Sequence, residues 1–168
     1  MTTEFEQRAV INQAVKRETR VTFLLSLTFL ASIAMYAAVA YFIRVRVVPG
    51  SFKTLQTIWE VFSFITVGLV IVVLAVRKTI YFSPRLIRDD FTLVALLQRW
   101  RVIDIILLTL AEAIAILGLI LALLGLPFSR TYFFFVSAFL VTMILMPIPW
   151  KVRDKLRYFE KYAGKLDE

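Results

Sequence analysis

Glu112 is the residue whose chemistry sets it apart from its surroundings. It lies near the middle of the apolar run 102–126, which contains no Lys or Arg to neutralise a carboxylate. An ionisable side chain at that depth in a bilayer costs a few kcal/mol on insertion scales, and such residues commonly serve a function. Because desolvation disfavours the charged form, we expect a neutral acid that both donates and accepts hydrogen bonds. Glu112 is therefore a candidate ion-binding residue.

Hydroxyl side chains could complete a site around this carboxyl group. Thr109 precedes it by about one helical turn, and Ser63 and Thr66 lie in another apolar run, 58–76. The remaining apolar runs offer Ser32, Tyr36, Ser137 and Thr142. We predict Glu112, Thr109, Ser63 and Thr66 as the ion-binding candidates. The alternative is that Glu112 only forms a structural hydrogen bond between helices.

Small residues recur next to Glu112 on the same run. Ala111, Ala115, Gly118 and Ala122 follow one another at spacings of four, three and four residues, which places them on one face of a helix. Such a stripe lets the backbone of another helix approach closely. We therefore predict that these residues pack against a helix and that Glu112, at the edge of the stripe, points toward a helix interface.

Residue types absent from the sequence exclude many enzymes. The chain has no Cys and no His, and its five Gly residues are scattered. Disulfides, thiolate or imidazole metal sites, and Cys–His or Ser–His catalysis are therefore excluded, and there is no Gly-rich phosphate loop. We predict no catalytic residues, no metal site and no cofactor, so we expect a protein that is not an enzyme. A membrane enzyme, for example one that acts on lipid, is a further alternative beside the two functions described below.

Membrane-spanning helices are the elements that must position these residues. The 168-residue chain is 60% apolar, with a mean hydropathy of +0.80. A bilayer core of about 30 Å requires about 20 apolar residues per helix. Four runs are of this order: 22–43, 58–76, 102–126 and 132–147. We predict one all-α domain, residues 1–168, that forms an integral membrane four-helix bundle of two transmembrane hairpins.

Amphipathic segments flank these spans. Residues 4–20 and the tail from residue 151 onward combine apolar and charged residues at helical spacing, and the segment 91–97 places apolar residues at this spacing after Asp89 and Asp90. We predict that all three form helices at the cytoplasmic membrane surface, with Asp89 or Asp90 as the N-cap of the segment 91–97.

The first half of the chain also aligns with the second. A shift of 81 residues places Arg20, Leu27, Thr28 and Ala34 on Arg101, Leu108, Thr109 and Ala115. The same shift superimposes one amphipathic segment on another. This match suggests an internal repeat, in which two hairpins of the same orientation pack about an axis along the membrane normal.

Positive charge is distributed unevenly between the two ends of the spans. Sixteen of the 20 Lys and Arg residues lie before the first span, between the second and third, or after the fourth, and four lie in the loops 44–57 and 127–130. The positive-inside rule then places both termini and the central loop in the cytoplasm, and we expect a bacterial inner or plasma membrane. These basic flanks suit the anionic headgroups of the lipid bilayer, whereas their dispersal argues against nucleic acid as a partner.

The segment 111–124 reads AEAIAILGLILALL. It resembles the carboxylate-bearing helix of the rotary ATPase proteolipid, subunit c, over about residues 102–126. The resemblance implies that Glu112 binds and releases a proton or sodium ion and that copies assemble side by side. The chain departs from that family because its carboxylate is on the third span rather than the last, and because Gly68 is the one Gly of the second span. It is therefore not a typical member.

These patterns indicate two alternative functions. In the first, the chain is a non-enzymatic multi-pass membrane protein that assembles as a homo-oligomer or with other membrane proteins, and Glu112 bonds helices together. In the second, it is a proteolipid-like membrane protein that binds protons or ions at Glu112. Both functions place Glu112 between helices, and they differ in whether its carboxyl group exchanges a proton.

Overall fold

The computed structural model of the chain describes residues 4–43, 52–81 and 93–146. These residues form four α-helices, with no strand among them: α1 (Glu4–Phe42), α2 (Phe52–Tyr81), α3 (Leu93–Leu123) and α4 (Phe128–Leu145). Each contains a segment long and apolar enough to cross a membrane: Thr19–Phe42, Thr54–Thr79, Gln98–Leu123 and Phe128–Leu145. The prediction of an all-α chain with four such helices is confirmed.

Two of the predicted surface segments are continuous with spans. α1 begins at Glu4, so the charged segment 4–20 enters the apolar part of the helix without a break. α3 begins at Leu93 and likewise continues into its span. A helix satisfies its backbone polar groups internally, which suits both a charged flank and an apolar span. Asp89, Asp90 and the tail from residue 151 lie outside the described residues, and the cytoplasmic location of all three segments stays a prediction.

The turn between α3 and α4 is short because α3 ends in a Schellman motif. The Gly125 N–H donates to the Ala122 carbonyl at 3.0 Å, and the Leu126 N–H donates to the Leu121 carbonyl at 3.1 Å. Gly125 has a φ of 95°, which residues with a Cβ rarely adopt. Pro127 follows, with a φ of −64° that suits the start of a helix. As a result, α3 ends three residues before the predicted end of its span, residue 126, and α4 begins four residues before the predicted start of its span, residue 132.

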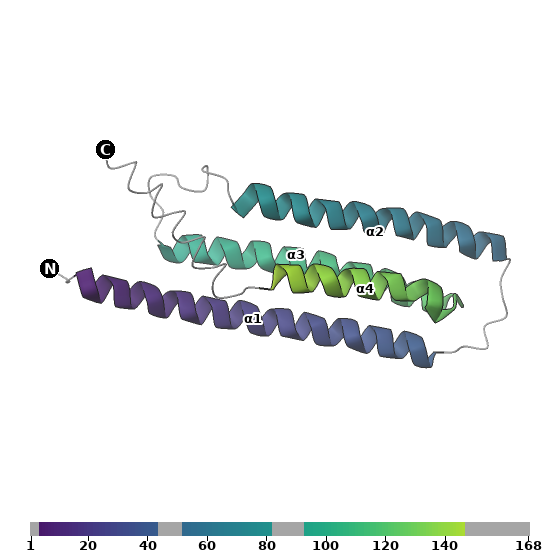
Figure 1. Ribbon diagram of the computed structural model, residues 1–168, viewed down its shortest axis with the longest axis horizontal. Helices are drawn as coiled ribbons and strands as arrows, with labels where there is room; N and C mark the ends of the chain where they lie inside the picture. The colour runs from purple at the N-terminus through teal and green to yellow at the C-terminus, as the bar shows by residue number, and fades with distance from the viewer. Residues whose placement is uncertain (1–3, 44–51, 82–92, 147–168) are drawn as a thin grey trace.

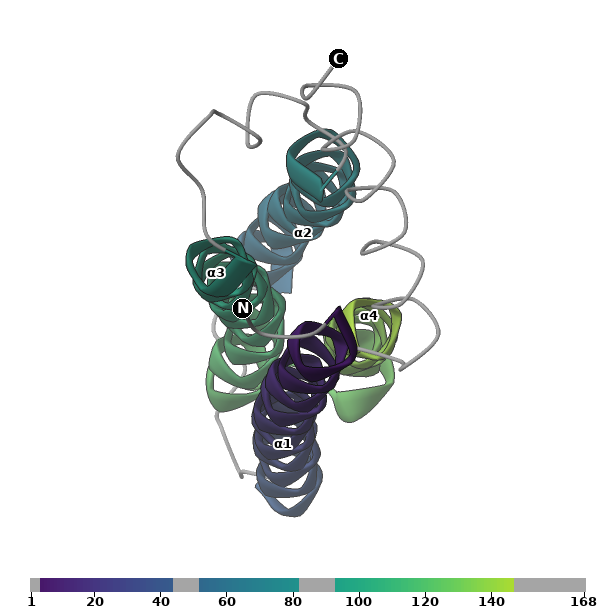
Figure 2. The same cartoon turned by 90° about the vertical axis from the view of Figure 1, so that its left-hand side faces the viewer.

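α3 and α4 form the centre of the bundle. They make the most extensive contact of any helix pair, and α1 packs against both of them. α2 packs mainly against α3 and less against α4. Viewed down the bundle, α1 and α2 lie on opposite sides of the α3–α4 pair (Figure 2). The two predicted hairpins are therefore packed differently, because α3 and α4 are in close contact whereas α1 and α2 lie apart. The internal repeat stays a prediction.

The basic residues of the bundle are distributed unevenly along its axis. The starts of α1 and α3 and the ends of α2 and α4 lie toward the same end (Figure 1). Most basic residues of the described helices are near this end: Lys16, Arg17, Arg20, Arg77, Lys78, Arg99 and Arg101. Lys53 and Arg130 are near the other end, at the starts of α2 and α4. This is the charge distribution that the predicted topology requires.

Two clusters of buried apolar residues hold the helices together. One joins α2, α3 and α4 and includes Val73, Leu108 and Val141. The other joins α1, α3 and α4 and includes Ile33 and Phe134. Within a bilayer, helices associate through such packing rather than through exclusion of water. α3 and α4 contribute to both clusters, and α1 and α2 each contact α3 more extensively than α4. α3, the helix that carries Glu112, is therefore the one around which the others are placed.

Candidate functional site

A hydrogen bond between α1 and α3 contains Glu112. The hydroxyl of Tyr36 donates to Glu112 Oε1 at 3.0 Å. Both side chains are half-buried, at the seam where α1 packs against α3. In a medium of low dielectric constant such a bond is stronger than in water. Tyr36, one of the hydroxyl residues that the sequence offers on other runs, is the partner that the fold brings to Glu112.

Glu112 lies at the boundary between the buried and the outward faces of α3. Ala111 and Ala115, on one side of it, are fully buried. Thr109 and Ile116, on the other side, are exposed. Within the described part of the chain, Tyr36 provides the single hydrogen bond to the carboxyl group of Glu112, and the second carboxyl oxygen, Oε2, receives none. The four helices therefore leave part of this carboxyl group unenclosed.

The other predicted ion-binding candidates do not bond to Glu112. Thr109 and Ser63 each donate to the backbone carbonyl four residues earlier in their own helix, at 2.9 Å and 2.8 Å. This is the usual way in which a hydroxyl is satisfied inside a helix. Thr66 is fully buried on α2, and its hydroxyl has no hydrogen-bond partner among the described residues. The fold thus joins Glu112 to Tyr36 and leaves the three predicted hydroxyls elsewhere.

The stripe of small residues packs inside the chain. All four members are buried: Ala111, Ala115, Gly118 and Ala122. A Cβ placed on Gly118 would lie 2.7 Å from the Cβ of Phe134 and 3.3 Å from the Cζ of Phe135. The backbone of α3 therefore approaches α4 so closely that a side chain at this position would push the two helices apart. At Gly118 the stripe thus packs against α4, and the stripe lies on a different face of α3 from Thr109 and Ile116.

Polar contacts attach α2 to its neighbours near both of its ends. The Trp59 indole N–H donates to the Arg130 carbonyl at 3.1 Å. The Arg77 guanidinium donates to the Ile144 carbonyl at 2.7 Å, where the end of α4 leaves carbonyl groups unpaired. Arg77 also interacts electrostatically with Asp104 of α3. These groups hold α2 in place rather than form a binding site.

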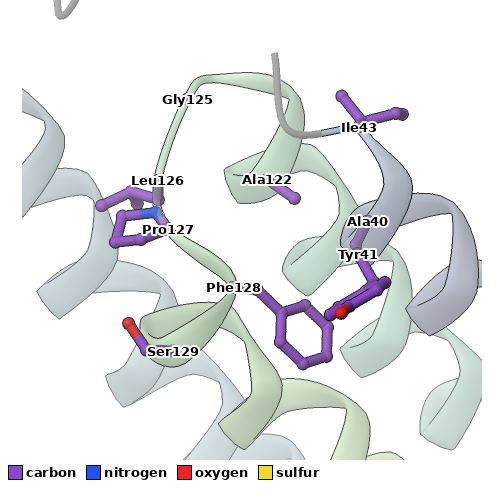
Figure 3. A pocket seen from close by; sticks show the side chains of 9 residues that line it. All are labelled: Ala40, Tyr41, Ile43, Ala122, Gly125, Leu126, Pro127, Phe128 and Ser129. Carbon is purple, nitrogen blue, oxygen red and sulfur yellow. The ribbon is translucent and has the colours of Figure 1, made fainter. Parts of the chain in front are cut away.

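A pocket of about 570 Å³ lies at the end of the bundle that carries the α3–α4 turn. The end of α1, the turn and the start of α4 line it. The rings of Tyr41 and Phe128 meet edge to face, with centroids 5.6 Å apart, and the Ser129 hydroxyl points away from them (Figure 3). Of the predicted site residues, Ala122 reaches this pocket. Most of its lining side chains are apolar, and Tyr41 and Ser129 contribute hydroxyl groups. The sequence did not reveal it, because it depends on how α1 meets the turn.

The chemistry that the Tyr36–Glu112 pair supports is proton binding and hydrogen bonding. Among the described residues, no group of three or more Asp, Glu, His or Cys lies together in a way that could hold a metal ion. The Tyr36–Glu112 pair can hold a proton, and it can bond to a neighbouring helix.

No protein-family model, curated protein or solved structure matches the chain. The resemblance of residues 102–126 to the proteolipid helix therefore stays a prediction, and the Glu112 site is the feature of the chain that bears on its function.

Proposed function

We propose that the protein is a non-enzymatic, multi-pass protein of a bacterial inner or plasma membrane that assembles with itself or with other membrane proteins. The observation that carries this proposal is the half-exposed position of Glu112 in the span of α3. The apolar side chains around it need no partner, because lipid covers them equally well. A carboxyl group that faces lipid does need one.

Glu112 retains hydrogen-bonding capacity that its own chain does not use. A neutral carboxyl group has one proton to donate and can accept bonds on both oxygens. Tyr36 donates to Oε1, and within the described part of the chain the carboxyl group makes no second hydrogen bond. In hydrocarbon each unsatisfied polar group costs several kcal/mol. A helix from another subunit that bonds to Glu112 would remove this cost, and this favours assembly.

The proposed orientation places both termini and the central loop in the cytoplasm. It is supported by the basic residues, which gather toward one end of the bundle. Anionic headgroups on that side of the bilayer would bind these residues, at roughly 1 kcal/mol for each Lys or Arg near the surface.

The test is to replace Glu112 and measure the size of the complex. Membrane vesicles that contain the protein are solubilised into nanodiscs together with their native lipid. Native mass spectrometry of these nanodiscs then gives the mass of the complex. We expect Glu112→Leu to lose assembly, because Leu cannot bond to a neighbouring helix, and Glu112→Gln to retain it, because an amide both donates and accepts.

Glu60→Gln is the matched control. Glu60 is exposed on α2, where Gln56 donates to it at 3.2 Å, and the proposal gives it no part in assembly. A complex of native mass is therefore expected for this variant. Native-sized complexes from Glu112→Leu would overturn the proposal.

The Tyr36–Glu112 bond also favours a second candidate, a proteolipid-like function in which Glu112 binds and releases a proton or another cation. A phenol hydroxyl 3.0 Å from the carboxyl oxygen stabilises the carboxylate after its proton leaves. In this case Glu112→Gln keeps assembly but abolishes ion flux into proteoliposomes. A carbodiimide, which attacks protonated carboxyl groups, would also label Glu112 in a pH-dependent way. Unchanged flux in Glu112→Gln would exclude this candidate.

A further inference from the structure

A stripe at heptad spacing lies on the outward side of α3. Its members follow one another at alternating spacings of four and three residues: Ile105, Thr109, Glu112, Ile116, Leu119 and Leu123. We call these residues the outer stripe. Four of them are exposed, and Glu112 and Leu119 are half-buried at its inner edge, where Leu119 packs against the second apolar cluster. One side of α3 faces no other helix (Figure 2). Alternating spacings of three and four residues are the pattern by which one helix packs along another in a left-handed pair, the commonest arrangement in membranes.

We infer that a second copy of the chain docks on the outer stripe, α3 against α3, and that Glu112 of one copy bonds to Glu112 of the other. This inference depends on the proposed function, in which another helix covers Glu112. It goes further because it names the partner and the surface. The occupant is another molecule of the same protein, inserted in the membrane with the same orientation.

Hydrogen-bond complementarity identifies a second copy as the occupant. All copies that share one topology hold Glu112 at the same depth, so a two-fold axis along the membrane normal places the outer stripe opposite itself. A neutral carboxyl group is complementary to another one, because each donates and accepts. Tyr36 bonds to Oε1 and leaves Oε2 available for this contact. A partner of a different sequence would need its own polar residue at the same depth.

The outward faces of the other helices lack such a group at mid-depth. On α2 the described ionisable residues of the span are Glu60, which bonds to Gln56, Arg77, which bonds to α4 near its end, and Lys78 in the last turn. The outward side chains of α1 in its apolar part, such as Leu27, Met35 and Val39, are covered by lipid at no cost. The outer stripe is therefore the surface that gains most from a second copy.

The contact between two carboxyl groups makes the self-association depend on pH. Two adjacent carboxyl groups in surroundings of low dielectric constant cannot both ionise. The pair of Glu112 side chains therefore retains at least one proton while the two copies are associated. At a pH where separated copies have lost this proton, each further pH unit weakens self-association at least about tenfold, because association must take the proton up again. From the packed helices, Tyr36 of α1 faces Glu112. Other titratable groups lie nearer the helix ends, as do Asp104, Arg77 and Arg130.

Cysteine cross-linking of the full-length chain tests the inference, since the sequence has no native Cys. Ile116→Cys places a thiol on the outer stripe one turn from Glu112. Phe64→Cys is the matched control, on the outward face of α2, where the side chain is 80% exposed. We expect oxidation in lipid vesicles to give disulfide-linked dimers from Ile116→Cys and none from Phe64→Cys, because a disulfide requires the two Cα atoms to approach within about 7 Å.

The cross-linking yield then reports on Glu112 itself. Glu112→Leu added to Ile116→Cys should abolish the dimer. Glu112→Gln should preserve it and remove its pH dependence, because an amide pair bonds without a titrating proton. A yield from Ile116→Cys that does not fall as the pH rises, with thiol reactivity corrected by a free-thiol label, would overturn the carboxyl pair.

Failure of the inference differs from failure of the proposed function. Dimers from Phe64→Cys without dimers from Ile116→Cys would show assembly through another face and overturn the inference alone. A large complex that contains one copy of the chain would also overturn the inference while the proposed function stands. A chain that is monomeric in native nanodiscs overturns both.

Discussion

The α3–α4 pair and helix α2 are held in the bundle by different means. In an apolar window of 18 residues in each span, 44% of the residues of α3 and 39% of those of α4 are buried, against 11% in α2. A tight turn and close backbone packing at Gly118 join the pair, whereas α2 uses one face and a polar contact near each end. In a chain whose helices are all apolar, an inner pair thus determines the fold, and outer helices keep surface free for lipid or a partner.

Removal of an aromatic ring should separate the two regions most clearly. Phe134 on α4 is fully buried, and Phe64 on α2 is 80% exposed. Phe134→Ala leaves a cavity and should lower the free energy of unfolding by about 3–5 kcal/mol, whereas Phe64→Ala should change it by less than about 0.5 kcal/mol. Titration of mixed micelles with SDS measures both values. Similar losses for the two variants would show that α2 is packed as tightly as the inner pair.

Addition of a methyl group should likewise lower the free energy of unfolding more in the α3–α4 pair than in α2. Gly118 has the Cβ of Phe134 within 2.7 Å of where its own Cβ would lie, whereas Gly68 on α2 has no atom within 4 Å of that point. Gly118→Ala should therefore cost about 1–3 kcal/mol of unfolding free energy through overpacking. Gly68→Ala should be neutral or slightly stabilising, because Ala forms helices better than Gly. If Gly118→Ala is tolerated as well as Gly68→Ala, the close approach of α3 and α4 is wrong.

Removal of a hydroxyl group should give the smallest effects, with opposite signs in the two regions. Thr142 on α4 and Thr66 on α2 are both fully buried. Thr142 donates to the Ala138 carbonyl at 2.8 Å, whereas the Thr66 hydroxyl has no partner in the described part of the chain. Thr142→Val should lower the free energy of unfolding by about 0.6 kcal/mol. Thr66→Val should raise it slightly, since an unsatisfied buried group is removed. A loss in Thr66→Val would reveal a bonding partner for Thr66.

The helices could be predicted from sequence because a bilayer fixes their length. Runs of about 20 apolar residues form spans whatever their neighbours, and all four spans were recognised in this way. Their arrangement could not be predicted. In soluble proteins a polar face shows which side of a helix is outward, but here apolar residues cover every side of α3, so the pattern does not distinguish α4 from lipid.

The candidate site was predictable to a similar extent. An acid within an apolar run is conspicuous, so Glu112 was identified at once, and the small residues beside it marked a helix contact. The choice of Tyr36 over Thr109, Ser63 and Thr66 could not be made, because it depends on which helix α1 packs against. The outer stripe was equally hidden, since its heptad spacing becomes informative only when the buried face of α3 is known.

Spin labelling measures most directly whether another helix covers Glu112 in the membrane. Thr109→Cys places a nitroxide next to Glu112 on the outward side of α3, and Val72→Cys places one on the outward side of α2, where the native side chain is 47% exposed. Electron paramagnetic resonance with oxygen, which dissolves in lipid, reports the exposure of each label in vesicles. We predict that the label at position 109 is shielded, that the label at position 72 is accessible, and that Glu112→Leu exposes position 109. Equal accessibility at the two positions in the otherwise native chain would contradict the assembly of this protein through Glu112.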